Sequence, residues 1–227
     1  MLLEVEGLEA GYGASQALFG VDLAVAEGEV VALMGRNGMG KTTTIRAICN
    51  LTPPRGGAVR FAGAALKGMP PHKVARLGIG LVPEGRRCFP NLTVEENLVA
   101  AARPGKWSFA TVTELFPRLA ERRTQMANTL SGGEQQMLAI GRALMTNPRL
   151  VILDEATEGL APVIRQDIWA AIRRLKGEGE SILIVDKTLP ELLPVADRCT
   201  VLENGRTVWT GAPDELGTEL QDRYLGV

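Results

Sequence analysis

The first residues whose types and spacing could do chemistry lie in a glycine-rich loop. The pattern G-x-x-x-x-G-K-[ST] is met by Gly35, Gly40, Lys41 and Thr42. Glycines allow several backbone N–H groups to point at one anion, the lysine adds a cation, and the threonine hydroxyl can hold Mg²⁺. The loop therefore predicts a binding site for a nucleoside triphosphate, with a chance match in a glycine-rich turn as the alternative.

The residues around this loop favour the first interpretation. An apolar run at 30–34 leads into the loop, and a helix-forming run follows from Thr42. Such a helix would aim the partial positive charge of its N-terminus at the same phosphates. We therefore expect the nucleotide contacts to come from Gly35, Arg36, Asn37, Gly38, Met39, Gly40, Lys41, Thr42 and Thr43.

Two carboxylates follow a second apolar run. Residues 150–153 read Leu-Val-Ile-Leu, and Asp154 and Glu155 come next. A buried strand that delivers acids at its C-terminal end beside a phosphate loop suits Mg²⁺ binding, so we assign Asp154 to the metal together with Thr42. Glu155 could orient or deprotonate an attacking water. The alternative is a strand that ends in a solvated acid pair.

A third pattern stands at the start of a predicted helix over 131–145. It reads Leu-Ser-Gly-Gly-Glu-Gln-Gln from Leu130. Ser131, Gly132 and Gly133 offer a hydroxyl and close-approach N–H groups at a helix N-terminus, which is a second anion site. Because one phosphate loop does not need two such sites, the economical explanation is a nucleotide bound to another chain. The alternative is a common turn with a helix cap.

The elements that must position these residues form an α/β pattern. Residues 2–33 read as β, and the short strands and tight turns before the strand that leads into the phosphate loop suggest an antiparallel β layer. Apolar runs typical of buried parallel strands occur at 78–83, 150–153 and 181–185. Helical patterns cover 42–50, 71–77 and 163–176, and a hairpin is predicted about Asn204-Gly205. We predict one ATPase domain over 1–227, whose P-loop core comprises 1–84 and 146–227.

The stretch of about 85–145 differs from the rest of the chain in its sequence pattern, because it has helical patterns and no strand pattern. Thr93 can cap a helix, with Glu96 three residues later completing a capping box. A second helical pattern covers 107–122, and the helix capped by Ser131 follows. The predicted fold class is therefore α/β: a P-loop ATPase core with an antiparallel β layer and an inserted helical subdomain.

Composition narrows the class of protein further. The 227 residues carry a net charge of −1 with no long run of either sign, so nucleic acid is not an expected partner. Three scattered cysteines, Cys49, Cys88 and Cys199, indicate reduced thiols that fill the core. No apolar run approaches the roughly 20 residues that span a bilayer, and the N-terminus lacks a signal peptide pattern. We expect a cytosolic protein that reaches a membrane only through a partner.

The three chemical patterns, in this order, resemble those of the ATP-binding subunits of ABC transporters. Within that family the chain is most similar to the shorter ATPase of branched-chain amino acid importers. This closer resemblance rests on the segments 83–98, 158–162 and 224–226. The ATPases of importers for urea or short amides have similar sequence segments. The resemblance therefore does not decide between these classes of transported substrate.

The resemblance implies a shared site. Two subunits would close head to tail, so that each ATP, with Mg²⁺, lies between one phosphate loop and the signature residues of the other chain. These signature residues are Ser131, Gly132, Gly133 and Glu134. Tyr12 would stack on the adenine, with an ordinary turn tyrosine as the alternative.

The resemblance also implies further partners. The second ATPase subunit could be an identical chain or a longer sister. Transmembrane permease subunits would contact the region of Arg86, Arg87 and Phe89, and a substrate-binding protein would take part indirectly. The chain would then lie at the cytoplasmic face of the plasma membrane as a peripheral subunit.

The chain departs from the family pattern at two positions near the expected site. Glu84 stands where most members have a glutamine that reaches Mg²⁺ or the lytic water; we assign Glu84 to the metal, with a solvated acid as the alternative. Lys187 stands where we expect a switch histidine. A lysine can bind a γ-phosphate as a charge, but it cannot exchange donor and acceptor roles near neutral pH as imidazole can. Glu155, Lys41 and Lys187 form the expected catalytic set.

We therefore expect the ATP-hydrolysing subunit of an importer for branched-chain or other hydrophobic amino acids. A second interpretation is a regulatory subunit that binds ATP but barely hydrolyses it, since Lys187 replaces the histidine. A soluble ABC protein acting on ribosomes or DNA would usually fuse two ATPase halves or carry long insertions. An ordinary P-loop kinase would leave residues 130–136 unexplained.

Overall fold

The strands of the protein form two sheets. The computed structural model describes residues 1–226. The smaller sheet is antiparallel, with the strand order β2-β1-β4-β5. Its strands are β1 (Leu3–Tyr12), β2 (Ser15–Val25), β4 (Gly56–Phe61) and β5 (Ala64–Ala65). This sheet confirms the predicted antiparallel layer, although the two-residue strand β5 has no distinct sequence signal.

The larger sheet has the order β10-β9-β3-β8-β7-β6. Its strands are β3 (Val30–Met34), β6 (Ile79–Val82), β7 (Leu150–Asp154), β8 (Ser181–Val185), β9 (Arg198–Glu203) and β10 (Arg206–Gly211). All neighbours pair in parallel except β9 and β10, which form the predicted hairpin. Asn204 and Gly205 both have positive φ, as a tight two-residue hairpin turn requires. The parallel strands end at one edge, where the chemical residues gather.

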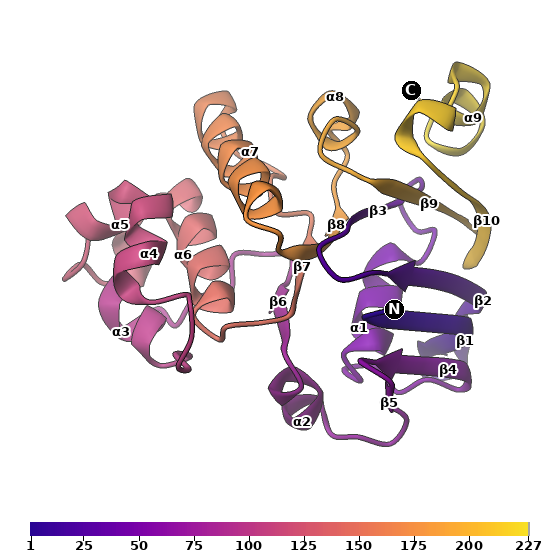
Figure 1. The fold of residues 1–227 in the computed structure, drawn as a ribbon, viewed down its shortest axis with the longest axis horizontal. Coiled ribbons are helices and arrows are strands. Elements are labelled where there is room, and N and C mark those ends of the chain that lie inside the picture. The colour runs from indigo at the N-terminus through magenta and orange to yellow at the C-terminus, as the bar shows by residue number, and fades with distance from the viewer. Residues whose placement is uncertain (227) are drawn as a thin grey trace.

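Side chains of the larger sheet alternate between two cores, so the molecule has three layers. Val31 and Leu33 face a core shared with the antiparallel sheet and α1 (Lys41–Ile48). Val30 and Ala32 face the other core, which contains α7 (Pro162–Gly177) and the helical part of the chain. Figure 1 shows the antiparallel strands β1, β2 and β4 beside α1, with α7 away from them. The helix α1 thus holds the phosphate loop between two sheets.

The predicted helical stretch forms a group at one end of the molecule (Figure 1). Its elements are α3 (Val94–Val99), α4 (Phe109–Leu115), α5 (Pro117–Glu121), the 3₁₀ turn η1 (Ala127–Thr129) and α6 (Gly132–Leu144). The described residues have no strand between 85 and 145, and the capping box of Thr93 and Glu96 is present. The division of the chain into a core and a helical subdomain stays a prediction.

The single helical pattern expected over 107–122 is wrong in one respect. The chain breaks it at Phe116, which has φ −129° and ψ 79°, into α4 and α5. Pro117 causes the break, because a proline disfavours helical geometry in the residue before it. The four-residue helix α8 (Leu189–Leu192) was also not expected.

The remaining elements are short. They are α2 (Pro71–Arg76), the 3₁₀ turn η2 (Pro213–Glu215) and α9 (Thr218–Tyr224). Cys49 and Cys199 are buried in the cores as predicted, and Cys88 is partly buried. Within residues 1–226, no helix combines the length and the apolar character that crossing a membrane requires.

Candidate functional site

The phosphate loop joins the end of β3 to the start of α1, and its glycines are required by geometry. Gly35 has φ +139°, and a Cβ there would lie 2.4 Å from the carbonyl oxygen of Leu202. Gly40 has φ +102°, and a Cβ there would lie 2.6 Å from a methyl carbon of Leu18. Residues with a side chain rarely adopt such φ values. The loop is therefore folded against its surroundings in a shape that only glycine allows.

Lys41 is the cation of this loop. Its Nζ donates hydrogen bonds to the carbonyl oxygens of Gly35 (2.7 Å) and Arg36 (3.0 Å). Burial lowers the pKa of Lys41, although the nearby Glu155 acts in the opposite direction. The ammonium thus lies inside the curve of the loop, where a phosphate oxygen could replace a carbonyl as its acceptor.

Thr42 and Asp154, the two residues first assigned to a metal, lie side by side. The Thr42 hydroxyl donates to Oδ1 of Asp154 over 3.3 Å, although 112 positions separate them in the sequence. Burial at the end of β7 raises the pKa of Asp154 to about 6, while the hydrogen bond from Thr42 lowers it. Hydroxyl and carboxylate oxygens are the ligands that Mg²⁺ prefers. The donor set of this pair therefore fits a magnesium ion.

Glu84, the third residue assigned to a metal, is exposed and belongs to a cluster of three acids. Carboxylate oxygens of Glu84, Glu155 and Glu158 lie within 4.8 Å of one another. The charge of Glu84 also contributes to the raised pKa of Asp154. The structure thus places Glu84 among the acids of the site, beside the expected catalytic glutamate Glu155.

Glu155 has an unusual backbone. Its φ is +52°, in the left-handed region that residues with a side chain rarely occupy, and its N–H donates to the carbonyl of Val185 over 2.9 Å. Burial, together with the neighbouring Glu158, raises the pKa of Glu155 to about 7. Strain of this kind persists where the surrounding structure fixes it, and functional sites are the usual place.

Lys187 makes ion pairs with two of the three clustered acids. Its Nζ lies 2.5 Å from Oε1 of Glu158 and 3.5 Å from Oε2 of Glu155. The hydrogen bond to Glu158 raises the pKa of Lys187. Lys187 therefore stays charged and occupies the mouth of the site beside Glu155.

These groups line a single pocket of about 340 Å³. It combines the phosphate loop with the ends of three parallel strands. The lining residues are Ala17, Asn37, Gly38, Gly40, Lys41, Thr42, Thr43, Glu84, Glu155, Glu158 and Lys187. The structure thus brings together most of the predicted loop, the expected catalytic set and two of the three residues assigned to the metal. Gly35, Arg36 and Met39 are not among the lining residues, and Asp154 is linked to the pocket through its hydrogen bond with Thr42.

Tyr12 lies at the end of β1, next to this pocket. Its hydroxyl is 3.4 Å from the Thr43 hydroxyl, and the residue is 48% exposed. The ring therefore stands beside the start of α1 with a free surface, where a base attached to bound phosphates could reach it.

Ser131 and Glu134 cap the helix α6. The Ser131 side chain accepts from the Glu134 N–H over 3.3 Å, and the Glu134 carboxylate accepts from the Ser131 N–H over 2.8 Å. Glu134 also pairs with Arg122. The capping alternative is thus realised for these side chains. Among the described residues that line the phosphate-loop pocket, none comes from Ser131–Glu134, so the predicted second anion site stays a prediction.

Comparison with known proteins decides the family. A family model described as "ABC transporter" matches residues 18–158. The chain belongs to this family. Its members are transport ATPases, so the predicted family and the predicted class of enzyme are confirmed. The fold class is confirmed by solved structures of ATP-binding cassettes.

Relatives of this ABC ATPase match it from end to end. The "High-affinity branched-chain amino acid transport ATP-binding protein BraG" of Pseudomonas aeruginosa is 44% identical, over 99% of this chain and 100% of that protein. The "Probable branched-chain amino acid transport ATP-binding protein LivF" of Archaeoglobus fulgidus is 34% identical, over 95% and 94%. A "Nod factor export ATP-binding protein I" of Ralstonia nicotianae is also 34% identical, over 96% and 69%.

Solved structures of ATP-binding cassettes share the fold. One titled "Structure of ATP binding subunit of ABC transporter" has a TM-score of 0.84 and 33% identity, covering 100% of this chain and 97% of its own. A cassette of an ABC transporter in an ADP conformation also has a TM-score of 0.84, with 28% identity over 97% and 95%. The three-layer arrangement is therefore that of an ABC cassette.

Sequence reasoning missed two residues of this ABC site. The sequence indicates Glu158 only as part of a family resemblance, whereas in the structure this side chain pairs with Lys187. Asp186 is buried and accepts a hydrogen bond of 2.6 Å from the Thr157 hydroxyl, which ties the loop after β7 to the loop after β8. An acid directly before Lys187 was the available signal, but its partner is 29 positions away.

Arg86, expected near a membrane partner, lies between two loops of the site. Its guanidinium donates to the carbonyl of Gly159 over 3.0 Å, and a Cβ on Gly132 would lie 2.1 Å from its Nη1. The backbone of Arg86 also has positive φ, at +51°. This arginine thus joins the start of α6 to the loop that follows Glu155.

Proposed function

We propose that this chain is the ATP-hydrolysing subunit of an importer for branched-chain or other hydrophobic amino acids. The observation that carries the proposal is the pocket in which Lys41, Thr42 and Glu155 meet. The amino-acid class is supported by the names of two relatives that match nearly the whole chain. Importers of urea or short amides remain the alternative for the transported substrate.

The phosphate loop would hold the triphosphate. Its backbone N–H groups and the N-terminus of α1 supply partial positive charge, and Lys41 supplies a full one. Thr42 and Asp154 would hold Mg²⁺, with Glu84 as a further oxygen ligand from the end of β6. The ion would neutralise charge on the phosphate oxygens during transfer.

Glu155 would act on the attacking water. A general base works best when its pKa lies near the working pH, and burial raises the pKa of Glu155 to about 7. The left-handed backbone directs this carboxylate into the pocket lined by Lys41 and Thr42. Lys187 would add a positive charge at the mouth of the pocket, where it could bind the γ-phosphate as the phosphate is transferred to water.

A second ATPase subunit would complete each site. Ser131, Gly132 and Gly133 lie at the N-terminus of the 13-residue helix α6, away from the pocket of their own chain. Backbone N–H groups at such an end attract an anion. In a head-to-tail pair these groups, with Glu134 holding the cap, would face the ATP bound to the other chain. Tyr12 would stack on the adenine of the ATP bound to its own chain, because its hydroxyl lies beside Thr43 of that pocket. The other chain is a second copy or a longer sister.

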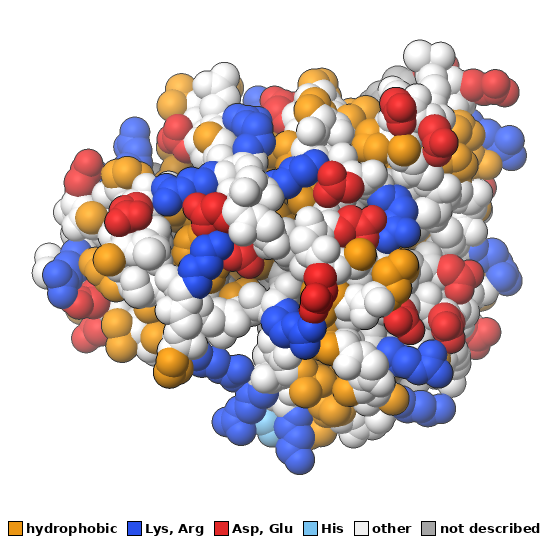
Figure 2. All heavy atoms as spheres, in the orientation of Figure 1, with side chains coloured by type: hydrophobic (Ala, Val, Ile, Leu, Met, Phe, Trp, Pro, Cys, Tyr) orange, Lys and Arg blue, Asp and Glu red, His pale blue; other side chains and the backbone are white. Residues whose placement is uncertain are grey.

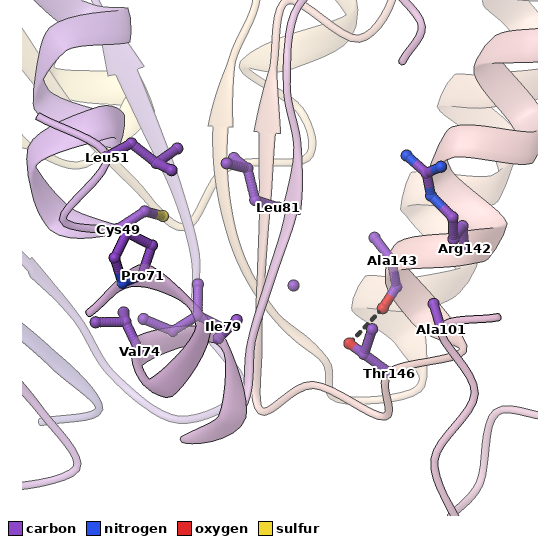
Figure 3. A pocket seen from close by; sticks show the side chains of 12 residues that line it. Cys49, Leu51, Pro71, Val74, Ile79, Leu81, Ala101, Arg142, Ala143 and Thr146 are labelled. Carbon is purple, nitrogen blue, oxygen red and sulfur yellow. Dashed lines mark hydrogen bonds between the residues drawn. The ribbon is translucent and has the colours of Figure 1, made fainter. Parts of the chain in front are cut away.

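A groove beside α2 would receive the transmembrane permease subunits. Figure 3 shows Leu51 and Pro71 on one side of it, Ala101 and Arg142 on the other, and Leu81 between them. Seven of the residues that line it between positions 49 and 81 carry apolar side chains; they are Cys49, Leu51, Pro71, Val74, Ala75, Ile79 and Leu81. The groove thus offers an apolar seat for a short segment of a membrane protein.

Phe89, expected near the membrane partner, stands at the rim of this groove. Phe89 is 50% exposed. The guanidinium carbon of Arg142 lies over the Phe89 ring, 4.7 Å from the ring centre. Arg142 also donates to the carbonyl of Arg87. Docking here would hold the chain at the cytoplasmic face of the plasma membrane, with a substrate-binding protein delivering the cargo to the permease.

The surface charge supports protein partners rather than nucleic acid. Figure 2 shows acidic and basic side chains mixed over the face that it draws, in keeping with a net charge of −1. Binding to a nucleic acid backbone depends on clustered positive charge.

Two assays test the proposed function. Purified chain should hydrolyse Mg-ATP, and Lys41→Ala should lower the rate about 100-fold or more, since the loop loses its cation. Vesicles that contain the permease subunits should take up labelled leucine only when the active chain is present. Uptake of urea instead of leucine would show that the proposed substrate class is wrong. Unchanged hydrolysis in Lys41→Ala would show that the phosphate-loop pocket is not the site of hydrolysis.

A regulatory subunit with little hydrolysis is the second candidate, because Lys187 lies 3.5 Å from Glu155 and partly engages the expected base. The same purified chain separates the two functions. A rate that depends on Lys41 supports the ATPase, and tight ATP binding without turnover supports the regulatory subunit.

A further inference from the structure

The ammonium of Lys187 lies within ion-pair distance of two carboxylates, those of Glu155 and Glu158. Its contact with Glu158, at 2.5 Å, is shorter than its contact with Glu155, at 3.5 Å. The side chains of Lys187 and Glu158 are nearly half exposed, at 46% and 47%, whereas that of Glu155 is 12% exposed. The ammonium thus lies closer to the more exposed acid, Glu158, than to the less exposed Glu155.

The backbone fixes where these side chains start. Asp186, directly before Lys187, accepts from the hydroxyl of Thr157, directly before Glu158, over 2.6 Å. Its other oxygen accepts from the N–H of Thr188 over 2.9 Å. Asp186 itself is buried. These bonds hold the two loops in register, so Glu158 and Lys187 meet at a defined place.

The position of Lys187 matters for Glu155. A lysine has a flexible four-carbon stem and a compact, strongly attracting charge. Without Glu158, the nearest remaining carboxylate is Glu155. An ammonium bound closely to Glu155 would occupy the oxygen that must receive a water. A residue that binds the Lys187 ammonium therefore keeps it from blocking the Glu155 carboxylate.

We propose that Glu158 is a positioning residue that retains the Lys187 ammonium and keeps the Glu155 carboxylate open to water. The proposal rests on the proposed ATPase function. It assigns a role to the chain's departure from the histidine pattern: a lysine at this position needs its own carboxylate partner. Glu158 acts through Lys187, whose Nζ lies 2.5 Å from its Oε1.

A double-mutant cycle tests this role, with kcat and KM for Mg-ATP measured on the purified chain and single-turnover rates for the slowest variants. Glu158→Gln should lower kcat about tenfold and change KM less than about twofold, because the phosphate loop is intact. In the Lys187→Met background, the same Glu158→Gln change should alter kcat less than about twofold. Glu158→Asp, which keeps the charge, should stay within about threefold of the parent.

The matched control is Glu6→Gln. Glu6 is an exposed glutamate that pairs with Arg60 over 3.2 Å on the antiparallel sheet, far from the pocket. It should leave kcat unchanged. Thermal unfolding of all variants with and without ATP separates misfolding from a lost role, because a folded variant is stabilised by the nucleotide.

Three results would overturn the proposal. They are an unchanged kcat in Glu158→Gln, an equal loss in the parent and Lys187→Met backgrounds, and an effect that lies in KM alone. Failure of the proposed function looks different, since the parent itself would then show no hydrolysis that depends on Lys41.

Discussion

Glu155 combines the backbone strain and the electrostatics that a catalytic acid–base residue needs. A glutamate with φ +52° carries a cost of about 1–3 kcal/mol that other contacts must offset. The N–H of Glu155 bonds to Val185 at the end of β8, and Asp154 lies immediately before it at the end of β7. Two neighbouring strands thus fix this one residue, and its carboxylate is directed into the pocket.

Glu155→Gln should abolish turnover and preserve nucleotide binding. Glutamine has nearly the same shape but cannot accept a proton, so kcat should fall about 100-fold or more, as expected when a general base is lost. ATP should still bind, because the phosphate loop is unchanged. Rapid-quench hydrolysis and equilibrium binding of labelled ATP measure the two quantities. A variant that turns over ATP at the parent rate would show that Glu155 is not the base.

At the scale of elements, the phosphate loop depends on its contact with the hairpin of β9 and β10. Gly35 lies against the carbonyl of Leu202 in β9, and Gly40 lies near Gly205 in the turn of the hairpin. The N–H of Gly205 also donates to the carbonyl of Met39 over 3.1 Å. The hairpin therefore supports the loop from outside, although it contributes no residue to the pocket.

Gly35→Ala and Gly38→Ala form a matched pair that tests this support. Both positions have positive φ, but a Cβ at Gly38 meets no atom within 4 Å, whereas one at Gly35 meets a backbone oxygen at 2.4 Å. Gly38→Ala should lower the free energy of unfolding by about 1 kcal/mol, the cost of left-handed geometry alone. Gly35→Ala should cost about 3 kcal/mol or more, because backbone must also move. Urea denaturation measures both, and equal losses would contradict the contact with Leu202.

The elements show how far the sequence alone could lead. Strands and helices bounded by glycine and proline were predictable, because those residues punctuate local structure. The two-residue β5 and the four-residue α8 were not, since such short elements depend on their neighbours. Within the site, the phosphate loop is contiguous and has its own sequence pattern. The pairing of Glu158 with Lys187 has none, because it arises only when β7 and β8 lie side by side and the backbone bends at Glu155.

At the scale of the whole molecule, the buried carboxylate at the end of β7 lowers the free energy of unfolding of the nucleotide-free protein. Asp154 is buried, and burial raises its pKa from 3.8 to about 6. Between those pH values the folded protein binds more protons than the unfolded chain, so the free energy of unfolding contributed by this group falls as the pH rises. Above pH 6 the full penalty remains, about 3 kcal/mol at most for a shift of two units. Nucleotide-free protein therefore carries a buried charge that a cation would relieve.

Asp154→Asn should stabilise the nucleotide-free protein while removing activity. The amide keeps an acceptor for Thr42 but carries no charge. The gain in unfolding free energy over the parent should be near zero at pH 4 and grow to about 2–3 kcal/mol by pH 7. Chemical denaturation at several pH values without magnesium measures this difference. A gain that does not vary with pH would contradict the raised pKa of Asp154.

The separation of Ser131–Glu134 from the pocket has a consequence for kinetics. If each site draws its two halves from two chains, hydrolysis by the purified protein is a second-order process at low concentration. Halving the protein should then cut the total rate about fourfold, and the rate per chain should level off only once the chains are paired. Initial rates over a hundredfold dilution series measure the order. A rate strictly proportional to protein would mean that one chain suffices. Binding of two such chains to one permease would hold them close together at any bulk concentration. In the membrane complex the hydrolysis rate per chain should therefore no longer fall on dilution.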